Sequence, residues 1–276
     1  MTGELAQLAP YGGAPLFAAY AGLGLAVGFV AGLLGVGGGL IIVPVLIMLL
    51  HTHGLAAGME PQLALGTSLA SILFTSLSSV RAHHRRGAVE WALAGRITPG
   101  IVLGTLVGAA LATRMPSTVL KVFFVVFLFY AAIQMWLDFK PTPHRGLPGR
   151  SGTSLAGGVI GLVSSWVGIG GGTLSVPFML WHNVPLHRAI ATSAAIGFPI
   201  ALAGATGYVL GGWTTDGLPA GSLGFVYLPA LAGIVLGSVL TAPLGARTAH
   251  RLPARPLKRV FAVLLFTLAL RMVWAF

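Results

Sequence analysis

Charged residues are scarce in this 276-residue sequence. They make up 8% of the chain, whereas a soluble domain has about 25%. Hydrophobic residues make up 56%, and the mean hydropathy is +0.91. Apolar runs such as 62–79 and 119–137 approach or reach the roughly 20 residues that a helix needs to span a bilayer. The strands of a soluble α/β protein are much shorter. The composition therefore excludes a soluble domain and predicts an all-α membrane protein.

Cysteine is absent, which excludes disulfides and thiol chemistry. Acidic residues are also few, with 5 Asp and Glu against 16 Lys and Arg and a net charge of +11. The arginines lie between apolar runs, so we interpret them as basic cytoplasmic loops beside a lipid bilayer rather than as a nucleic-acid surface. GxSxG, HExxH and P-loop motifs are missing. We expect no enzymatic activity and no cofactor.

Side chains suited to metal or proton chemistry are also lacking inside the apolar runs. All eight histidines lie at segment ends or in loops, so we expect no metal site. The carboxylates Glu60, Glu90, Asp138 and Asp216 are expected near the membrane interfaces rather than in a proton relay. Arg96 is the cation best placed to attract an anion inward; the alternative is that it extends to the lipid headgroups.

What the sequence does contain is a duplicated glycine motif. Gly35–Pro44 reads GVGGGLIIVP, and Gly168–Pro177 reads GIGGGTLSVP. A triple glycine in apolar surroundings ends a helix and lets the backbone approach another group closely. After each motif the apolar run is short, about 15 Å as a helix, which is half of a bilayer core. We therefore predict half-helices that begin inside the membrane.

Other matches follow the glycine motif in the same order. The run Ala64–Ser68 (ALGTS) corresponds to Ala189–Ser193 (AIATS), and Ile101–Gly104 corresponds to Ile234–Gly237. We predict a first transmembrane repeat at 1–140, a cytoplasmic linker at 141–152 and a second repeat at 153–276. The apolar segments fall at 15–34, 40–50, 62–80, 92–112 and 118–137, and then at 153–167, 173–182, 188–210, 222–243 and 257–275.

Loop charges predict that the two repeats have opposite orientations. The loop from Arg81 to Glu90 is basic, whereas its counterpart from Gly211 to Gly221 carries one acid and no base. Between the last two segments of each half the bias is reversed, because Arg247–Arg259 is the more basic loop. Five segments per half would invert the second copy, with both termini outside. The N-terminus lacks the basic start of a signal peptide, so we expect the first helix to be retained.

The two glycine turns suggest an anion site. The first N–H groups of a helix lack intrahelical partners, and at the positive end of the helix they bind anions. Hydroxyls early in the third segment of each half could add donors. Alternatively, the glycines serve only helix packing and the hydroxyls bond to their own helices. The candidate substrate-binding residues are Gly37, Gly38, Gly39, Leu40, Thr67, Ser68, Gly170, Gly171, Gly172, Thr173, Thr192 and Ser193.

Together these motifs resemble the TauE/SafE sulfite-exporter family across nearly the whole chain. The resemblance implies an integral membrane transporter of small sulfur-containing anions such as sulfite, thiosulfate or organosulfonates. It implies export in the best-known members and import in others, and the inner membrane if the host is Gram-negative. The second half departs by having Ala191 where the first has Gly66, so the two sides of the site need not be equivalent.

Our hypothesis is alternating access at a midplane site between the halves, where inverted-repeat transporters bind their substrates. A proton or sodium ion is a candidate coupling ion. Two alternatives stay open, a passive anion channel and a carrier of another small anion such as a carboxylate.

Overall fold

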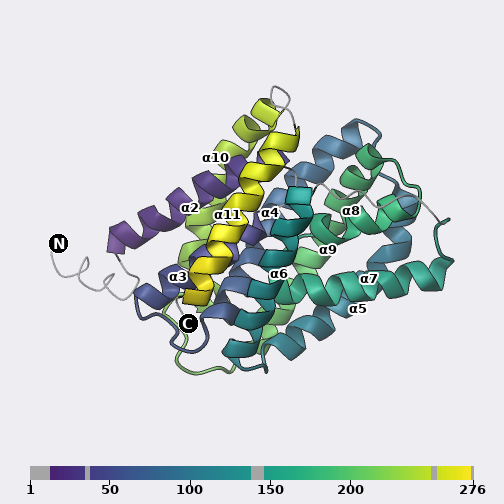
Figure 1. Cartoon of the computed structure of the whole chain (residues 1–276). Helices are drawn as coiled ribbons and strands as arrows, with labels where there is room; N and C mark the ends of the chain where they lie inside the picture. Colours follow the sequence, from purple (N-terminus) through teal and green to yellow (C-terminus); the bar gives the residue numbers. More distant parts are fainter. Residues whose placement is uncertain (1–12, 35–37, 138–145, 250–253, 275–276) are drawn as a thin grey trace.

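The computed structural model describes residues 13–34, 38–137, 146–249 and 254–274, and these are almost entirely helical (Figure 1). In the first half the helices are α2 (Gly13–Leu34), α3 (Gly39–Thr52), α4 (Glu60–Arg85), α5 (Trp91–Ala112) and α6 (Ser117–Leu137). In the second half they are α7 (Arg150–Val167), α8 (Gly172–Trp181), α9 (Leu186–Gly211), α10 (Leu228–Ala249) and α11 (Ala254–Trp274). The strands β1 (Ser222–Leu223) and β2 (Val226–Tyr227) form a small antiparallel hairpin.

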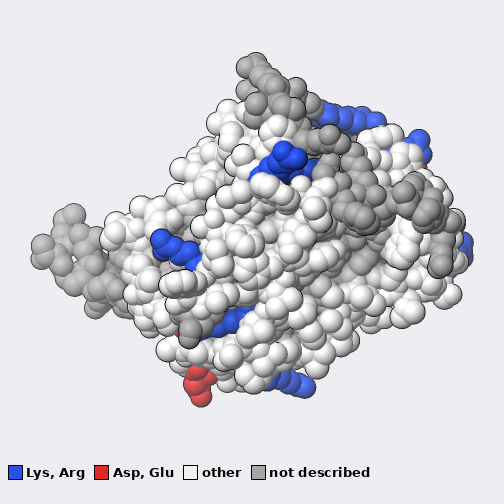
Figure 2. All heavy atoms as spheres, viewed as in Figure 1, with Lys and Arg blue, Asp and Glu red and all other residues white. Residues whose placement is uncertain are grey.

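Six of these helices are long and apolar enough to cross a membrane, namely α2, α4, α5, α6, α9 and α10. The visible face of the molecule is mostly uncharged, with a few isolated basic side chains (Figure 2). The predicted all-α membrane fold is confirmed. So are the two short segments after the glycine motifs, because α3 has 14 residues and α8 has 10. The opposite orientation of the two halves stays a prediction.

The most extensive helix contacts join the two halves of the chain. Helix α2 packs along α10, α5 along α7, α4 along α9, and α6 along α11. The first two pairs correspond to each other, because α2 matches α7 and α5 matches α10 in the order of the repeat. This arrangement agrees with an internal duplication whose halves exchange helices; the duplication itself stays a prediction. The centre of the molecule is therefore built by both halves together.

Glycines bring the paired backbones together. A Cβ at Gly104 of α5 would overlap the carbonyl group of Gly158 on α7. A Cβ at Gly24 of α2 would likewise overlap the backbone of Ile234 on α10. Small residues at helix interfaces are the usual means of close packing in membranes, where dispersion contacts replace the hydrophobic effect. The glycines of these long helices therefore serve close helix packing.

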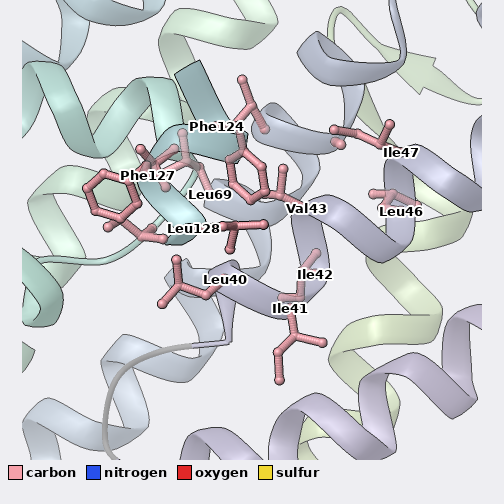
Figure 3. Close-up of a cluster of buried hydrophobic side chains, with 14 of the residues drawn as sticks. Leu40, Ile41, Ile42, Val43, Leu46, Ile47, Leu69, Phe124, Phe127 and Leu128 are labelled. Carbon is pink, nitrogen blue, oxygen red and sulfur yellow. The ribbon is translucent and has the colours of Figure 1, made fainter. Parts of the chain in front are cut away.

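The short helix α3 lies in the core. Leu40, Val43 and Leu46 on α3 are fully buried. They lie in one cluster with Leu69 of α4 and with Phe124, Phe127 and Leu128 of α6 (Figure 3). A helix that is apolar on all sides has no face for water, so protein must surround it. The start of α3, which carries the described part of the first glycine motif, is therefore enclosed by protein.

The expected segment 222–243 is wrong at its beginning. Residues Ser222–Tyr227 form the hairpin, and α10 starts only at Leu228. The reason is local geometry, since Gly221 and Gly224 have φ angles of +83° and +52°, which a right-handed helix does not allow. The predicted linker 141–152 lies partly outside the described residues, and α7 already begins at Arg150.

The glycine contacts lead to a stability prediction. A Cβ at Gly100 of α5 would overlap the Ser154 carbonyl of α7, whereas Gly95 on the same helix has nothing within 4 Å. We expect Gly100→Val to destabilise the protein by about 1–3 kcal/mol through overpacking. Gly95→Val should change little. The stability of both variants can be measured by thermal unfolding in detergent, with the fraction of monodisperse protein as the readout. Equal unfolding midpoints for the two variants would contradict this packing.

Candidate functional site

The second glycine motif forms a tight turn between α7 and α8. Gly168 follows the last residue of α7 in a left-handed conformation, with φ +66°, and its N–H donates to the carbonyl of Ser164. A side chain there would be strained and would meet Val43 and Leu65 of the first half at 2.8 and 3.0 Å. Gly168 is therefore required both by the turn and by the contact between the halves.

The first glycine motif packs directly on this turn. A Cβ at Gly39 would overlap the carbonyl oxygen of Gly168. The Ser68 hydroxyl of α4 donates to the same oxygen at 2.7 Å. Gly38 and Leu40 are also buried here, whereas Gly37 lies outside the described residues. The two motifs, which are far apart in the sequence, thus meet at one point between the halves.

The start of α8 presents backbone donors without acceptors. Ser175 N–H bonds to the Gly171 carbonyl at 2.8 Å, but no acceptor within the described ranges pairs with the N–H groups of Gly172 and Thr173. The Thr173 hydroxyl is also unpaired there, although the residue is only 7% exposed. Buried donors that lack partners are uncommon and costly. At the positive end of a helix they suit an anion.

Beside these donors two glycines leave room for a methyl group. A Cβ at Gly197 of α9 would lie 3.8 Å from the Gly171 nitrogen and 4.0 Å from the Ser76 Cβ of α4, and would clash with neither. A Cβ at Gly170 would have only an ordinary contact of 3.6 Å, with Ile72. The neighbouring side chains are otherwise apolar, which strengthens any electrostatic interaction formed there.

The predicted threonines have another role in this conformation. The Thr67 hydroxyl of α4 accepts a hydrogen bond from the backbone N–H of Tyr227, the residue before α10, at 2.9 Å. Thr192 of α9 accepts from the N–H of Glu90, the residue before α5, at 3.0 Å. The two bonds correspond in the repeat, and each joins a helix of one half to a helix start of the other half. Both threonines are fully buried.

Two other candidates are placed differently. The Ser193 hydroxyl donates to the Ile190 carbonyl of its own helix at 2.8 Å, which is the common arrangement for serine in a membrane helix. Arg96 is exposed on α5, so the described residues do not bring its charge into the buried site.

Two further buried hydroxyls lack partners among the described residues. Thr105 of α5 and Ser164 of α7 are both fully buried, and neither hydroxyl has a partner within the described residues. A Cβ at Gly161 would lie 2.7 Å from the Thr105 hydroxyl, which places Thr105 against α7. No sequence signal distinguishes Thr105 from other threonines, since its isolation depends on the α5–α7 contact.

Glu60, which is expected near a membrane interface, is buried within the protein. It is 4% exposed at the start of α4 and lies 3.3 Å from the His51 Nδ1 of α3 and 3.8 Å from the Lys121 Nζ of α6. The three side chains join three helix ends. The cluster lies at the far end of α3 from the glycine turn, so we interpret it as a structural ion pair. Within the described residues no group of His, Asp and Glu could hold a metal.

Six helices that are long and apolar enough to span a membrane, together with two short helices that begin at glycine turns, define an integral membrane protein. The family model described as "Sulfite exporter TauE/SafE" matches residues 20–272. The chain belongs to the TauE/SafE family.

Relatives in distant organisms support this assignment. The chain is similar to a "Probable membrane transporter protein" of Haemophilus influenzae, with 35% identity over 251 residues, 91% of this chain and 95% of the relative. It is also similar to the "Probable membrane transporter protein YunE" of Bacillus subtilis, with 28% identity, 91% of this chain and 95% of the relative. A Methanocaldococcus jannaschii relative with the same description is 26% identical and covers 91% of this chain and 93% of its own length. No solved structure matches the chain.

The threonine bonds between the halves give a second prediction. Thr67→Val keeps the side-chain shape but leaves the Tyr227 N–H without its acceptor. We expect a loss of about 1–3 kcal/mol in stability, the usual effect of an unpaired buried donor. Thr98→Val on α5 is the matched control, because the Thr98 hydroxyl only donates to the Ala94 carbonyl of its own helix at 2.7 Å. Equal thermal midpoints for the two variants would show that the Thr67 bond contributes nothing.

Proposed function

We propose that this protein is a secondary transporter that exports small sulfur-containing anions, namely sulfite, thiosulfate or an organosulfonate. The substrate class rests on membership of a family described as sulfite exporters. The observation that carries the site is the start of α8. There the Thr173 hydroxyl is buried without a partner among the described residues, and the N–H groups of Gly172 and Thr173 have no acceptor among them. These neutral donors suit an oxyanion, because they supply hydrogen bonds without a fixed positive charge.

The proposed site is asymmetric. Gly39 at the start of α3 packs on the Gly168 carbonyl, while Gly171, Gly197 and Ser76 lie close together beside the start of α8. The substrate would be held by the second half and enclosed by α4 of the first half. The site expected from the sequence is two-sided, with donors from both glycine turns. The proposed site keeps only the donors of the second turn.

The contact between the turns favours a carrier over an open channel. Gly39 and Gly168 touch, so passage between the halves requires their helices to move apart. We propose alternating access between the halves in the bacterial inner membrane. The basic end of α4 at Arg81–Arg86 and the central linker would then be cytoplasmic, and both termini would lie outside. A proton or sodium ion remains the candidate coupling ion.

The test is sulfite flux in proteoliposomes. We expect Thr173→Val to raise the half-saturating sulfite concentration about tenfold or more, because a hydrogen bond to a charged group contributes about 1.5–3 kcal/mol. Gly197→Val should have a similar effect, since its side chain would fill the space beside the Gly171 nitrogen. Thr98→Val and Gly95→Val are the matched controls and should behave like the unmodified protein.

Three outcomes would count against the proposal. Unchanged saturation in folded Thr173→Val and Gly197→Val variants would remove the α8 site. Flux of a small carboxylate with no flux of sulfite, thiosulfate or sulfonate would change the substrate class. Flux that neither saturates nor runs against a gradient would identify a passive anion channel.

A further inference from the structure

A groove of about 350 Å³ lies along one face of the C-terminal part of α4, away from the glycine turns. It is lined by Phe74, Leu77, Ser78, Arg81 and Arg85. At 3.6 residues per turn these positions share one side of the helix. Ser76, beside the proposed transport site, lies on the opposite side of α4. The groove is therefore separate from the path between the halves.

The lining changes character along the helix. Phe74 and Leu77 are 52% and 43% exposed, so the inner end of the groove is an open apolar surface. Ser78 follows, and the exposed Arg81 and Arg85 form the outer end. From Phe74 to Arg85 the helix rises about 16 Å. This order matches an amphiphile that has an acyl chain at one end and an anionic headgroup at the other.

The two arginines have no carboxylate partner among the described residues. Glu60 pairs with His51 and Lys121, and Glu90 pairs with Arg188. No ion pair involves Arg81 or Arg85 within the described ranges. Their charge is thus available to an external anion, and guanidinium groups bind phosphate with two parallel hydrogen bonds.

The depth of the arginines also fits a lipid headgroup. Trp91, at the start of α5, is 52% exposed and donates its Nε1–H to the Nδ1 of His84 at 3.2 Å. Exposed tryptophan is typical of the membrane interface. His84 is adjacent to Arg85, so both arginines lie near the level of the headgroups, with Phe74 and Leu77 deeper in the hydrocarbon.

We propose that this groove binds one anionic phospholipid, with its phosphate on Arg81 and Arg85 and an acyl chain along Phe74 and Leu77. Phosphatidylglycerol is a suitable probe, since its headgroup carries a net negative charge and phosphatidylcholine does not. The site rests on the groove and its charges and does not depend on what the protein transports.

Native mass spectrometry of the purified protein in a neutral detergent tests the site with short-chain phosphatidylglycerol. The Arg81→Gln/Arg85→Gln variant should bind it about thirtyfold more weakly, because each basic contact contributes about 1 kcal/mol. It should also lose the preference over phosphatidylcholine. Arg86→Gln is the matched control, since Arg86 is exposed next to the groove but does not line it; it should change affinity less than about twofold.

A folding defect is separated from a binding defect by Arg81→Lys/Arg85→Lys, which keeps both charges and should retain most of the affinity. Phe74→Ala should weaken binding of the lipid, whereas glycerol phosphate without acyl chains should bind poorly to every form. The proposal is wrong if Arg86→Gln and the double glutamine variant weaken binding equally. It is also wrong if neither does, or if glycerol phosphate or sulfite competes as well as the lipid, which would mark a site for free anions.

Discussion

The structure depends on one constraint, that backbone polar groups in a membrane must find partners inside the protein. The chain interrupts its helices at the two glycine motifs and again at the hairpin before α10. At each interruption that the structure describes, the other half of the molecule supplies packing or a hydrogen bond. Ser68 donates to the Gly168 carbonyl, and Thr67 accepts from the Tyr227 N–H. The breaks are tolerated because protein, rather than lipid, surrounds them.

This requirement explains why the halves are intertwined. A half whose broken helices faced lipid would leave several N–H and carbonyl groups unpaired, at a cost of several kcal/mol each. Exchange of α2 and α7 between the halves brings glycine-rich faces together and buries the motifs at the centre. The donors at the start of α8 have no acceptor within the described residues. Unpaired donors in such surroundings are the natural place for a substrate whose binding completes them.

Much of this could be predicted from the sequence. The low charge, the lengths of the apolar runs and the ordered repeat indicated the helices to within a few residues, because span length and hydropathy are local properties. The short helices α3 and α8 were predicted for the same reason. The hairpin at residues 222–227 was not predicted, because these residues continue an apolar run that is typical of a membrane helix. Only the backbone conformation of Gly221 and Gly224 prevents the helix from starting there. The burial of Glu60 was also missed, because it depends on His51 and Lys121 arriving from two other helices.

The sequence by itself determined the class of protein, the repeated glycine turns and the short helices that follow them. Tertiary structure decided which polar groups remain available to a ligand. Thr67 and Thr173 look equally suitable as donors in the sequence, yet Thr67 accepts a backbone hydrogen bond from the other half while the Thr173 hydroxyl has no partner among the described residues. The difference arises because the hydrogen bond between Thr67 and Tyr227 joins residues 160 positions apart, and no local pattern specifies which atoms will meet.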